Sequence, residues 1–245
     1  MNSAKGFCSG LLLLLLFSPI ASALSIVVKE EAPYAGKNLP GNGLSMEIVQ
    51  KALQLAGYET ELVFETWPRA YEGASIGIYD VVGSIWYTEK RARTFAFSEP
   101  YLLHEIKFIK RRSKPEIQFT GMEDLDGLII GTLKGYAYQD AFLQSRQFIR
   151  VQQNYLLQNL LLLTQGKIDL ALGDVRKIDQ ELQQYMKGSI KDLEILPTAL
   201  IIRGAHIAVS KDNPRHEEII AGLNRALAKM KADGSYQEIF RRHGY

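Results

Sequence analysis

Strand-like and helix-like stretches alternate along this chain, and the alternation constrains its fold more than any other feature of the sequence. The first set comprises expected strands at 25–28, 58–64 and 79–85, a helix at 45–56 and a short helix that opens at Pro68. Strands that alternate with helices form parallel sheets joined by crossover helices. The first part of the chain is therefore predicted to be a βαβαβ unit.

The alternation starts again after residue 110. A strand at 105–110 leads to expected strands at 128–131 and 168–172 and to helices near 138–148, at 154–165 and around 177–185. A strand at 205–209 then precedes a long helix that opens at 212–214 and is capped by Gly234, and residues 235–238 match a capping box for a last short helix. The middle of the chain is thus expected to build a second sheet.

The final helix pair has no following strand beneath it, so the simplest arrangement returns it to the first sheet. The predicted fold class is α/β with two lobes, each a mainly parallel sheet flanked by helices. Residues 24–110 and 205–245 form lobe 1, and residues 111–204 are inserted as lobe 2. Two crossings, near Lys110 and near Ala205, would act as a hinge beside a cleft.

The N-terminus, residues 1–23, has the layout of a secretory signal peptide. Lys5 precedes an apolar run at 11–17, which is too short to span a bilayer, and Ala21-Ser22-Ala23 is a small-x-small cleavage signature. An uncleaved anchor is the alternative. Cleavage would remove Cys8, the only cysteine, so we expect a soluble periplasmic protein held together by its core without disulfides.

Composition and motifs exclude several functions. The formal net charge of +2 is too small for a nucleic-acid surface. The histidines are scattered without metal-ligand spacing, at 104, 206, 216 and 243. The sequence has no Walker-type phosphate loop and no Gly-x-Ser-x-Gly elbow. We therefore expect no metal site, no cofactor and no catalytic residues.

Four segments suited to binding a small zwitterion follow expected strands: 32–34, 86–91, 131–135 and 169–174. In open α/β sheets, ligands bind in the crevice beyond the carboxyl ends of the strands. In the second segment, Thr88 is a plausible N-cap and Arg91 lies in the first helical turn. The Arg91 guanidinium and the free backbone N–H groups could together hold a carboxylate. The alternative is a surface arginine.

The other segments supply further candidates. Asp174 follows an apolar strand and suits an ammonium group, although Asp is also a common helix N-cap. Thr132, at an expected strand-to-helix turn, could bind the carboxylate or simply cap a helix. Four aromatic residues could form the apolar walls of the cleft or pack in the core: Tyr34, Trp67, Trp86 and Tyr87.

Several motifs together resemble one family. Thr88-Glu89-Lys90-Arg91 followed by Phe97-Ser98-Glu99-Pro100-Tyr101 is similar to the Thr-x-x-Arg … Phe-Ser-x-Pro-Tyr signature of bacterial extracellular solute-binding proteins, family 3. Residues 122–132, 166–174 and 232–236 resemble further segments of that family in the same order. The resemblance covers essentially the whole mature chain.

The resemblance implies a type II periplasmic-binding-protein-like fold and a monomer that captures an amino acid or similar polar solute for an ABC permease in the inner membrane. It implies that Arg91 grips the α-carboxylate, Asp174 holds the α-amino group, and Tyr34 and Trp86 are wall residues. Two departures stand out. Ala96 replaces a frequent Asp, and Trp86 replaces a small polar residue, so the pocket or the ligand class could differ.

Two other functions stay open. The first is a periplasmic sensing module that reports to a separate membrane partner. The second is an enzyme like cyclohexadienyl dehydratase on the same fold, which would need a second carboxylate near Asp174. Arg69 could be a second anion contact, or a surface residue of a helix.

Overall fold

The computed structural model describes residues 23–245. The predicted signal peptide lies, except for Ala23, outside the described residues. Within 23–245, no helix combines the length and the apolar character that crossing a membrane requires.

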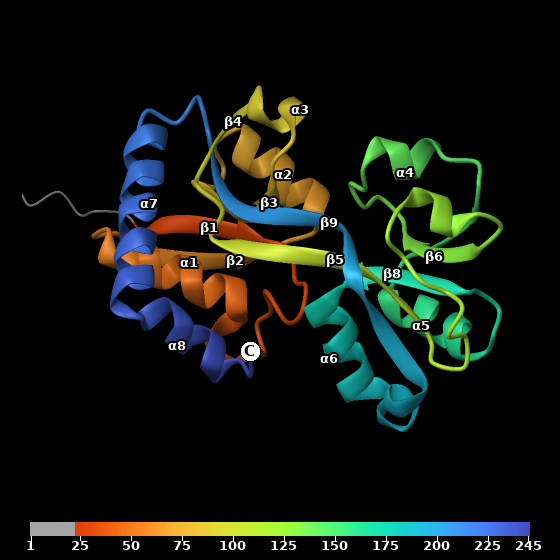
Figure 1. The fold of residues 1–245 in the computed structure, drawn as a ribbon. Helices are drawn as coiled ribbons and strands as arrows, with labels where there is room; N and C mark the ends of the chain where they lie inside the picture. The colour runs from red at the N-terminus through yellow and green to blue at the C-terminus, as the bar shows by residue number, and fades with distance from the viewer. Residues whose placement is uncertain (1–22) are drawn as a thin grey trace, which may run out of the picture.

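Lobe 1 contains both ends of the described chain. It consists of β1 (Leu24–Val28), η1 (Pro40–Asn42), α1 (Leu44–Leu55), β2 (Thr60–Phe64), α2 (Trp67–Ser75), β3 (Val81–Trp86), α3 (Glu89–Ala92) and β4 (Phe95–Phe97), followed much later by α7 (His216–Asp233) and α8 (Ser235–Arg242). β1 pairs in parallel with both β2 and β3, which confirms the predicted βαβαβ unit. The last two helices pack beside α1, as the predicted return to the first sheet requires (Figure 1).

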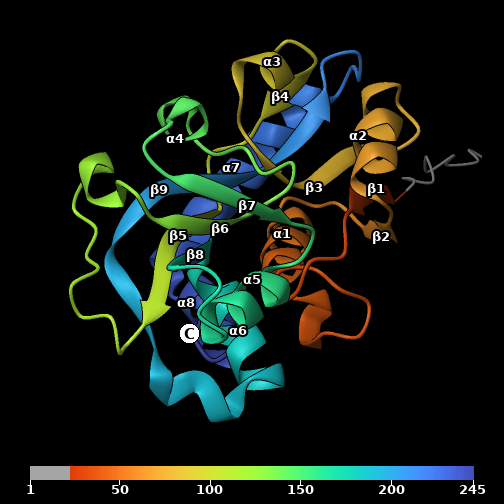
Figure 2. The same cartoon turned by 90° about the vertical axis from the view of Figure 1, so that its right-hand side faces the viewer.

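Lobe 2 is built from the middle of the chain. Its elements are η2 (Met122–Leu125), β6 (Ile129–Leu133), α4 (Asp140–Gln144), β7 (Ile149–Gln153), α5 (Leu156–Thr164), β8 (Leu170–Asp174), α6 (Val175–Tyr185) and η3 (Lys187–Asp192). β6 pairs in parallel with β7 and β8. Figure 2 views the molecule from the lobe 2 side, with α5 and α6 in front.

Two long strands join the lobes. β5 (Leu102–Arg111) and β9 (Leu193–Ser210) pair antiparallel along almost their full common length, and both run from one lobe into the other (Figure 1). They connect the two parallel sheets into one strand order, β2-β1-β3-β9-β5-β8-β6-β7, with β4 added beside β9. The predicted two-lobe α/β fold with two crossings is therefore confirmed.

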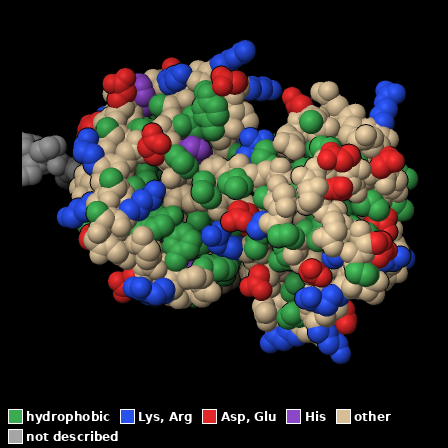
Figure 3. Space-filling model, in the orientation of Figure 1, with side chains coloured by type: hydrophobic (Ala, Val, Ile, Leu, Met, Phe, Trp, Pro, Cys, Tyr) green, Lys and Arg blue, Asp and Glu red, His purple; other side chains and the backbone are tan. Residues whose placement is uncertain are grey.

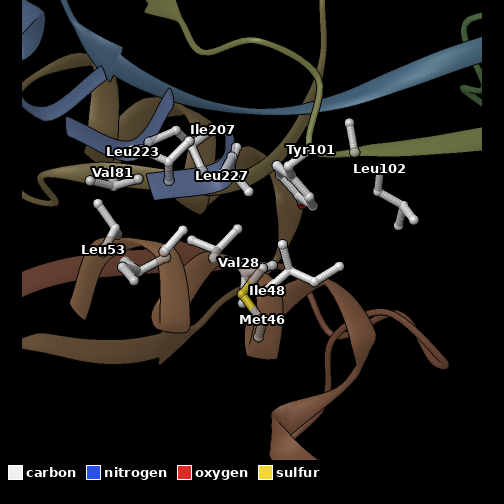
Figure 4. Close-up of a cluster of buried hydrophobic side chains, with 14 of the residues drawn as sticks. Val28, Met46, Ile48, Leu53, Val81, Tyr101, Leu102, Ile207, Leu223 and Leu227 are labelled. Carbon is white, nitrogen blue, oxygen red and sulfur yellow. The ribbon is translucent and has the colours of Figure 1, made fainter. Parts of the chain in front are cut away.

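Each lobe has its own hydrophobic core. In lobe 1, apolar side chains of α1 and α7 pack against β1, β3 and β9, and Figure 4 shows part of this cluster. Separate clusters fill lobe 2 around β5, β6 and β8. On β5, Leu102 belongs to the first core and Ile106 to the second. Because these two residues belong to different cores, the chain is expected to cross between the lobes in the stretch that separates them. The lobe limits near Lys110 and near Ala205 remain predictions.

Two of the expected elements differ from the structure, and one strand of lobe 2 had no counterpart in the prediction. The helix expected near 138–148 is only α4, because Arg150 Nη1 binds the carbonyl oxygens of Phe142 and Ser145 and ends the helix there. β7 follows directly and was not expected. The strand expected at 205–209 is the last part of the much longer β9, whose first half lies in lobe 2.

The last helix begins differently from the prediction. Gly234 ends α7 in the left-handed conformation, with φ 83°, which confirms its predicted role as a cap. The capping box at 235–238 is wrong, because the Ser235 hydroxyl donates to Asp233 instead of accepting from the backbone of Glu238.

Gly83 on β3 provides a test of how tightly lobe 1 is packed. A Cβ atom at this position would lie 2.8 Å from Ile26 Cγ2 and 3.0 Å from Met46 Cε. We expect Gly83→Ala to lower the free energy of unfolding by about 1–3 kcal/mol through overpacking. Gly188→Ala is the matched control because a Cβ there meets nothing within 4 Å. Urea unfolding measures the free energy of unfolding of both variants. Equal values for Gly83→Ala and Gly188→Ala would contradict tight packing around Gly83.

Candidate ligand-binding cleft

The lobes contact each other through polar side chains at the ends of their strands. Tyr34, in the loop after β1, donates its hydroxyl hydrogen to Asp174 Oδ1 at the end of β8. Glu31 in the same loop accepts from Lys177 Nζ on α6. Figure 3 shows acidic and basic side chains side by side where the two lobes meet. Two of the four predicted segments are thus brought together directly.

Asp174 is the most enclosed acidic group of this cleft. It is 2% exposed, and as the N-cap of α6 its Oδ1 also accepts from the backbone N–H of Lys177 at 3.1 Å. The alternative role as a helix cap is therefore confirmed. Burial alone would raise the pKa of Asp174, but hydrogen bonds from His104, Tyr34 and Lys177 outweigh burial and lower it. The carboxyl group is ionised at neutral pH.

His104 is a cleft residue that the sequence did not reveal. Its Nδ1 lies 3.1 Å from Asp174 Oδ2, and its ring contacts Tyr34 edge-on with 4.5 Å between centroids. In the β5–β8 ladder Asp174 lies opposite Ile106, so His104, two residues away, is its diagonal neighbour on the same face. Because an ionised carboxylate only accepts, Nδ1 carries the hydrogen. Nε2 is buried and has no hydrogen-bond partner among the described residues.

A second charged group lies beside Asp174. Glu31 accepts from Tyr136 OH at 2.9 Å as well as from Lys177 Nζ, and Lys29 Nζ lies 3.6 Å from its other oxygen. Burial alone would raise the pKa of Glu31, but the Lys177 and Lys29 ammonium groups and the hydrogen bonds from Lys177 and Tyr136 lower it to about 2. No pattern in the sequence singled out this cluster, in which Glu31 and Lys177 lie 146 residues apart.

Arg91 lies on the short helix α3 of lobe 1, just after the end of β3. Thr88 caps α3, as predicted, by accepting from the backbone N–H of Arg91 at 3.2 Å. Arg91 Nη1 donates to the carbonyl oxygen of Trp86 at 2.7 Å, and its guanidinium lies 5.0 Å from the centroid of the Trp67 ring. Burial lowers the pKa of this half-buried group. Within the described part of the chain, no carboxylate forms an ion pair with Arg91.

Trp86 forms part of an aromatic wall. The centroid of its ring lies 5.8 Å from that of the His104 ring and 5.4 Å from that of the Tyr136 ring. Trp86 therefore contacts residues of the hinge strand and of lobe 2. Tyr34 continues this wall on the other side of His104. Both predicted wall residues therefore lie in the cleft, and their contact with a ligand remains a prediction.

Thr132 is placed differently from the expectation. It lies inside β6, opposite Gln152 of β7, and the next helix along the chain starts only at Asp140. The capping role is therefore wrong, because the strand continues past this residue. The Thr132 side chain is 1% exposed, and its hydroxyl has no partner in the described structure.

Arg69, the other possible anion contact, pairs with Glu65 at 3.6 Å on the surface of lobe 1.

Metal binding finds no support in the cleft or elsewhere in residues 23–245. No three His, Cys, Asp or Glu side chains of this part of the chain converge in a way that could hold a metal ion. The charged groups of the cleft are instead suited to hydrogen bonding and ion pairing.

Comparison with known proteins gives the family. The model of the bacterial extracellular solute-binding proteins, family 3, matches residues 24–244. ABC transporter arginine-binding protein 1 of Escherichia coli (strain K12) is 26% identical over 163 residues. That match covers 66% of this chain and 64% of the relative, so the chain spans less than two thirds of the relative's length.

Solved structures show the same fold. A binding component of an ABC transporter from Wolinella succinogenes, complexed with lysine, superposes with a TM-score of 0.74 at 21% identity, covering 90% of this chain and 94% of that one. A histidine kinase sensor domain with similarity to periplasmic binding proteins gives 0.69 at 21% identity, covering 90% and 95%. The match to the family model extends over nearly the whole described chain, and this chain belongs to the bacterial extracellular solute-binding proteins, family 3.

Proposed function

We propose that this protein is a periplasmic receptor that captures an amino acid or a similar small polar solute by hinge closure and delivers it to an ABC importer. The family and the amino acid-binding ABC transporter proteins among its relatives support this class of function. The predicted signal peptide supports a periplasmic location. The permease partner and the monomeric state belong to the same proposal.

One observation carries the proposal: the Arg91 guanidinium, just after β3, is half-buried and forms no ion pair with a carboxylate in the described structure. Its interactions with the Trp86 carbonyl oxygen and the Trp67 ring fix its position but leave its charge without a counter-ion. A guanidinium has five N–H donors in a planar fork that matches a carboxylate. A ligand carboxylate would complete this arrangement.

The polar contacts between the lobes support capture by hinge closure. Tyr34 and Glu31 of lobe 1 reach Asp174 and Lys177 of lobe 2, and these pairs form only when the lobes are together. A solute can enter between them only when they separate. Closure around a ligand is then favoured by the contacts that the closed state alone can make.

The cleft supports binding over catalysis. A dehydratase-like enzyme would need a second carboxylate near Asp174, and the candidate is Glu31, which binds Lys177 Nζ while Asp174 binds the backbone N–H of the same residue. A general acid at neutral pH needs a pKa near 7. Lys177 and Lys29 overcome the effect of burial and lower the pKa of Glu31 to about 2, so Glu31 has no proton to donate.

Loss of the Arg91 side chain should impair binding. We expect Arg91→Ala to cost about 2–5 kcal/mol of affinity for a carboxylate ligand, or roughly 30-fold to several thousand-fold in Kd. Arg91→Lys keeps the charge without the planar fork and should recover only part of the loss. The measurement is calorimetric titration with the best ligand from a thermal-shift screen of amino acids, opines, polyamines and small carboxylates.

Arg93→Ala is the control for this experiment, because Arg93 caps the end of the same short helix and is exposed. Its affinity should match the wild type. If Arg91→Ala and Arg93→Ala bind equally well, Arg91 is not the anchor. If no compound stabilises the wild-type protein, the receptor proposal itself is wrong.

The Glu31 cluster should make stability depend on pH. The ordinary pKa of Glu31, 4.5, is lowered to about 2 on folding, so its contribution is complete above about pH 4.5 and is lost as the pH falls toward 2. We expect Glu31→Gln to reduce the free energy of unfolding at pH 7 by about 1–3 kcal/mol. The difference from the wild type should shrink between pH 4.5 and the lowest pH at which both remain folded.

Glu30→Gln serves as the neighbouring control, because Glu30 is exposed and its carboxylate accepts a hydrogen bond from the backbone N–H of Lys37. It should change stability little at any pH. Urea unfolding at several pH values measures both variants. A Glu31→Gln effect that is constant with pH would mean that the carboxylate charge does not stabilise the contact between the lobes.

A further inference from the structure

The two carboxylates Asp174 and Glu31 have several hydrogen-bond partners within the chain, whereas the Arg91 guanidinium has few. Asp174 uses three donors of the chain itself: Tyr34 OH and the backbone N–H of Lys177 on Oδ1, and His104 Nδ1 on Oδ2. An ionised carboxylate accepts about four hydrogen bonds, and this one is 98% buried. The carboxylate that would bind a ligand amine is therefore already enclosed.

The origin of these donors matters for the ligand. Tyr34 comes from lobe 1 and His104 from the hinge strand β5, whereas Asp174 ends a strand of lobe 2. The phenol hydroxyl reaches the Asp174 carboxylate from the other lobe, and the imidazole reaches it from the neighbouring strand β5. A ligand ammonium group that binds Asp174 through more than the one remaining acceptor position would have to displace at least one of these hydrogen bonds, which are stronger than hydrogen bonds between neutral groups.

Glu31, the other carboxylate of the cleft, is satisfied in the same way. The ammonium group of Lys177 binds one of its oxygens together with Tyr136 OH, and Lys177 Nζ lies 3.2 Å from that hydroxyl. The chain's own cation thus occupies the place that a basic ligand would take. Arg91, in contrast, donates one side-chain hydrogen bond, from Nη1 to the Trp86 carbonyl oxygen, and forms no ion pair among the described residues.

From this asymmetry we infer that the ligand is an organic acid without a primary amine. Arg91 binds its carboxylate, and Tyr34 and His104 exclude an α-amino group by occupying Asp174. The aromatic wall of Tyr34, His104 and Trp86 favours an apolar body behind the carboxylate. This inference rests on the proposed receptor function and narrows its ligand class.

Matched pairs of compounds test the inference. The mature protein, residues 24–245, is titrated calorimetrically with each amino acid and with the acid that lacks only its amine: phenylalanine and 3-phenylpropionate, leucine and 4-methylpentanoate, glutamate and glutarate, arginine and 5-guanidinopentanoate. We expect the acid to bind at least about tenfold more tightly than the amino acid in at least one pair, because the amine must displace a hydrogen bond to a charged group.

The outcomes separate this inference from the proposed function. If, in every pair that binds, the amino acid binds as tightly as the acid or more tightly, the inference is overturned and the receptor proposal stands. If none of the eight compounds binds, and a wider screen of small solutes also finds no ligand, both are overturned. If the wider screen finds only ligands that carry a primary amine, the inference alone is overturned.

Two variants test the roles of the residues. Tyr34→Phe removes one donor from Asp174 and should shift the preference about tenfold toward the amino acid of a pair. Tyr138→Phe is the control, because Tyr138 is buried in lobe 2 and its hydroxyl bonds the backbone N–H of Leu133. It should leave the ratio of the two affinities unchanged. An unchanged ratio in Tyr34→Phe would overturn the role of Tyr34 in excluding the amine.

Discussion

The contact between the lobes depends on one buried carboxylate. Asp174 ends β8, opens α6 and is almost fully removed from water. A buried charge is tolerated only when hydrogen bonds replace its hydration. One of its three donors is the backbone of its own helix, and the other two, Tyr34 and His104, come from outside the inserted segment. Because the buried charge needs these donors, it favours the arrangement in which the lobes meet.

The hinge strands connect that requirement to the rest of the fold. His104 lies on β5 between Leu102, in the core of lobe 1, and Ile106, in the core of lobe 2. It faces Arg203 on β9, whose Nη2 donates to the carbonyl oxygen of Ala137 in lobe 2. The residues at the crossing thus carry side chains that bind lobe 2. Because His104 lies at the crossing and binds Asp174, the strand pair that joins the lobes also carries a partner of the buried carboxylate.

Local patterns explain what the sequence could predict. Apolar periodicity indicated the strands and helices of both sheets, and the end of β8 identified Asp174. Prediction failed where contacts outside the local apolar pattern determine the structure, whether the partners are a few residues away or far along the chain. Arg150 shortens α4 by binding carbonyl groups, and the strand around Thr132 continues because β7 pairs with it. His104 and Lys177 were missed as cleft residues because their partners lie 70 and 146 residues away.

Trp86 shows how a departure from the family pattern can leave one function intact and change another. Its backbone carbonyl oxygen accepts from Arg91 Nη1, an interaction that does not depend on the side chain. Its indole ring separately fills the space between His104 and Tyr136. A small polar residue at this position would leave the carbonyl oxygen available to Arg91 but would remove the ring from the wall. The Trp86 carbonyl oxygen and the Trp67 ring thus hold the guanidinium, while the Trp86 indole belongs to the aromatic wall.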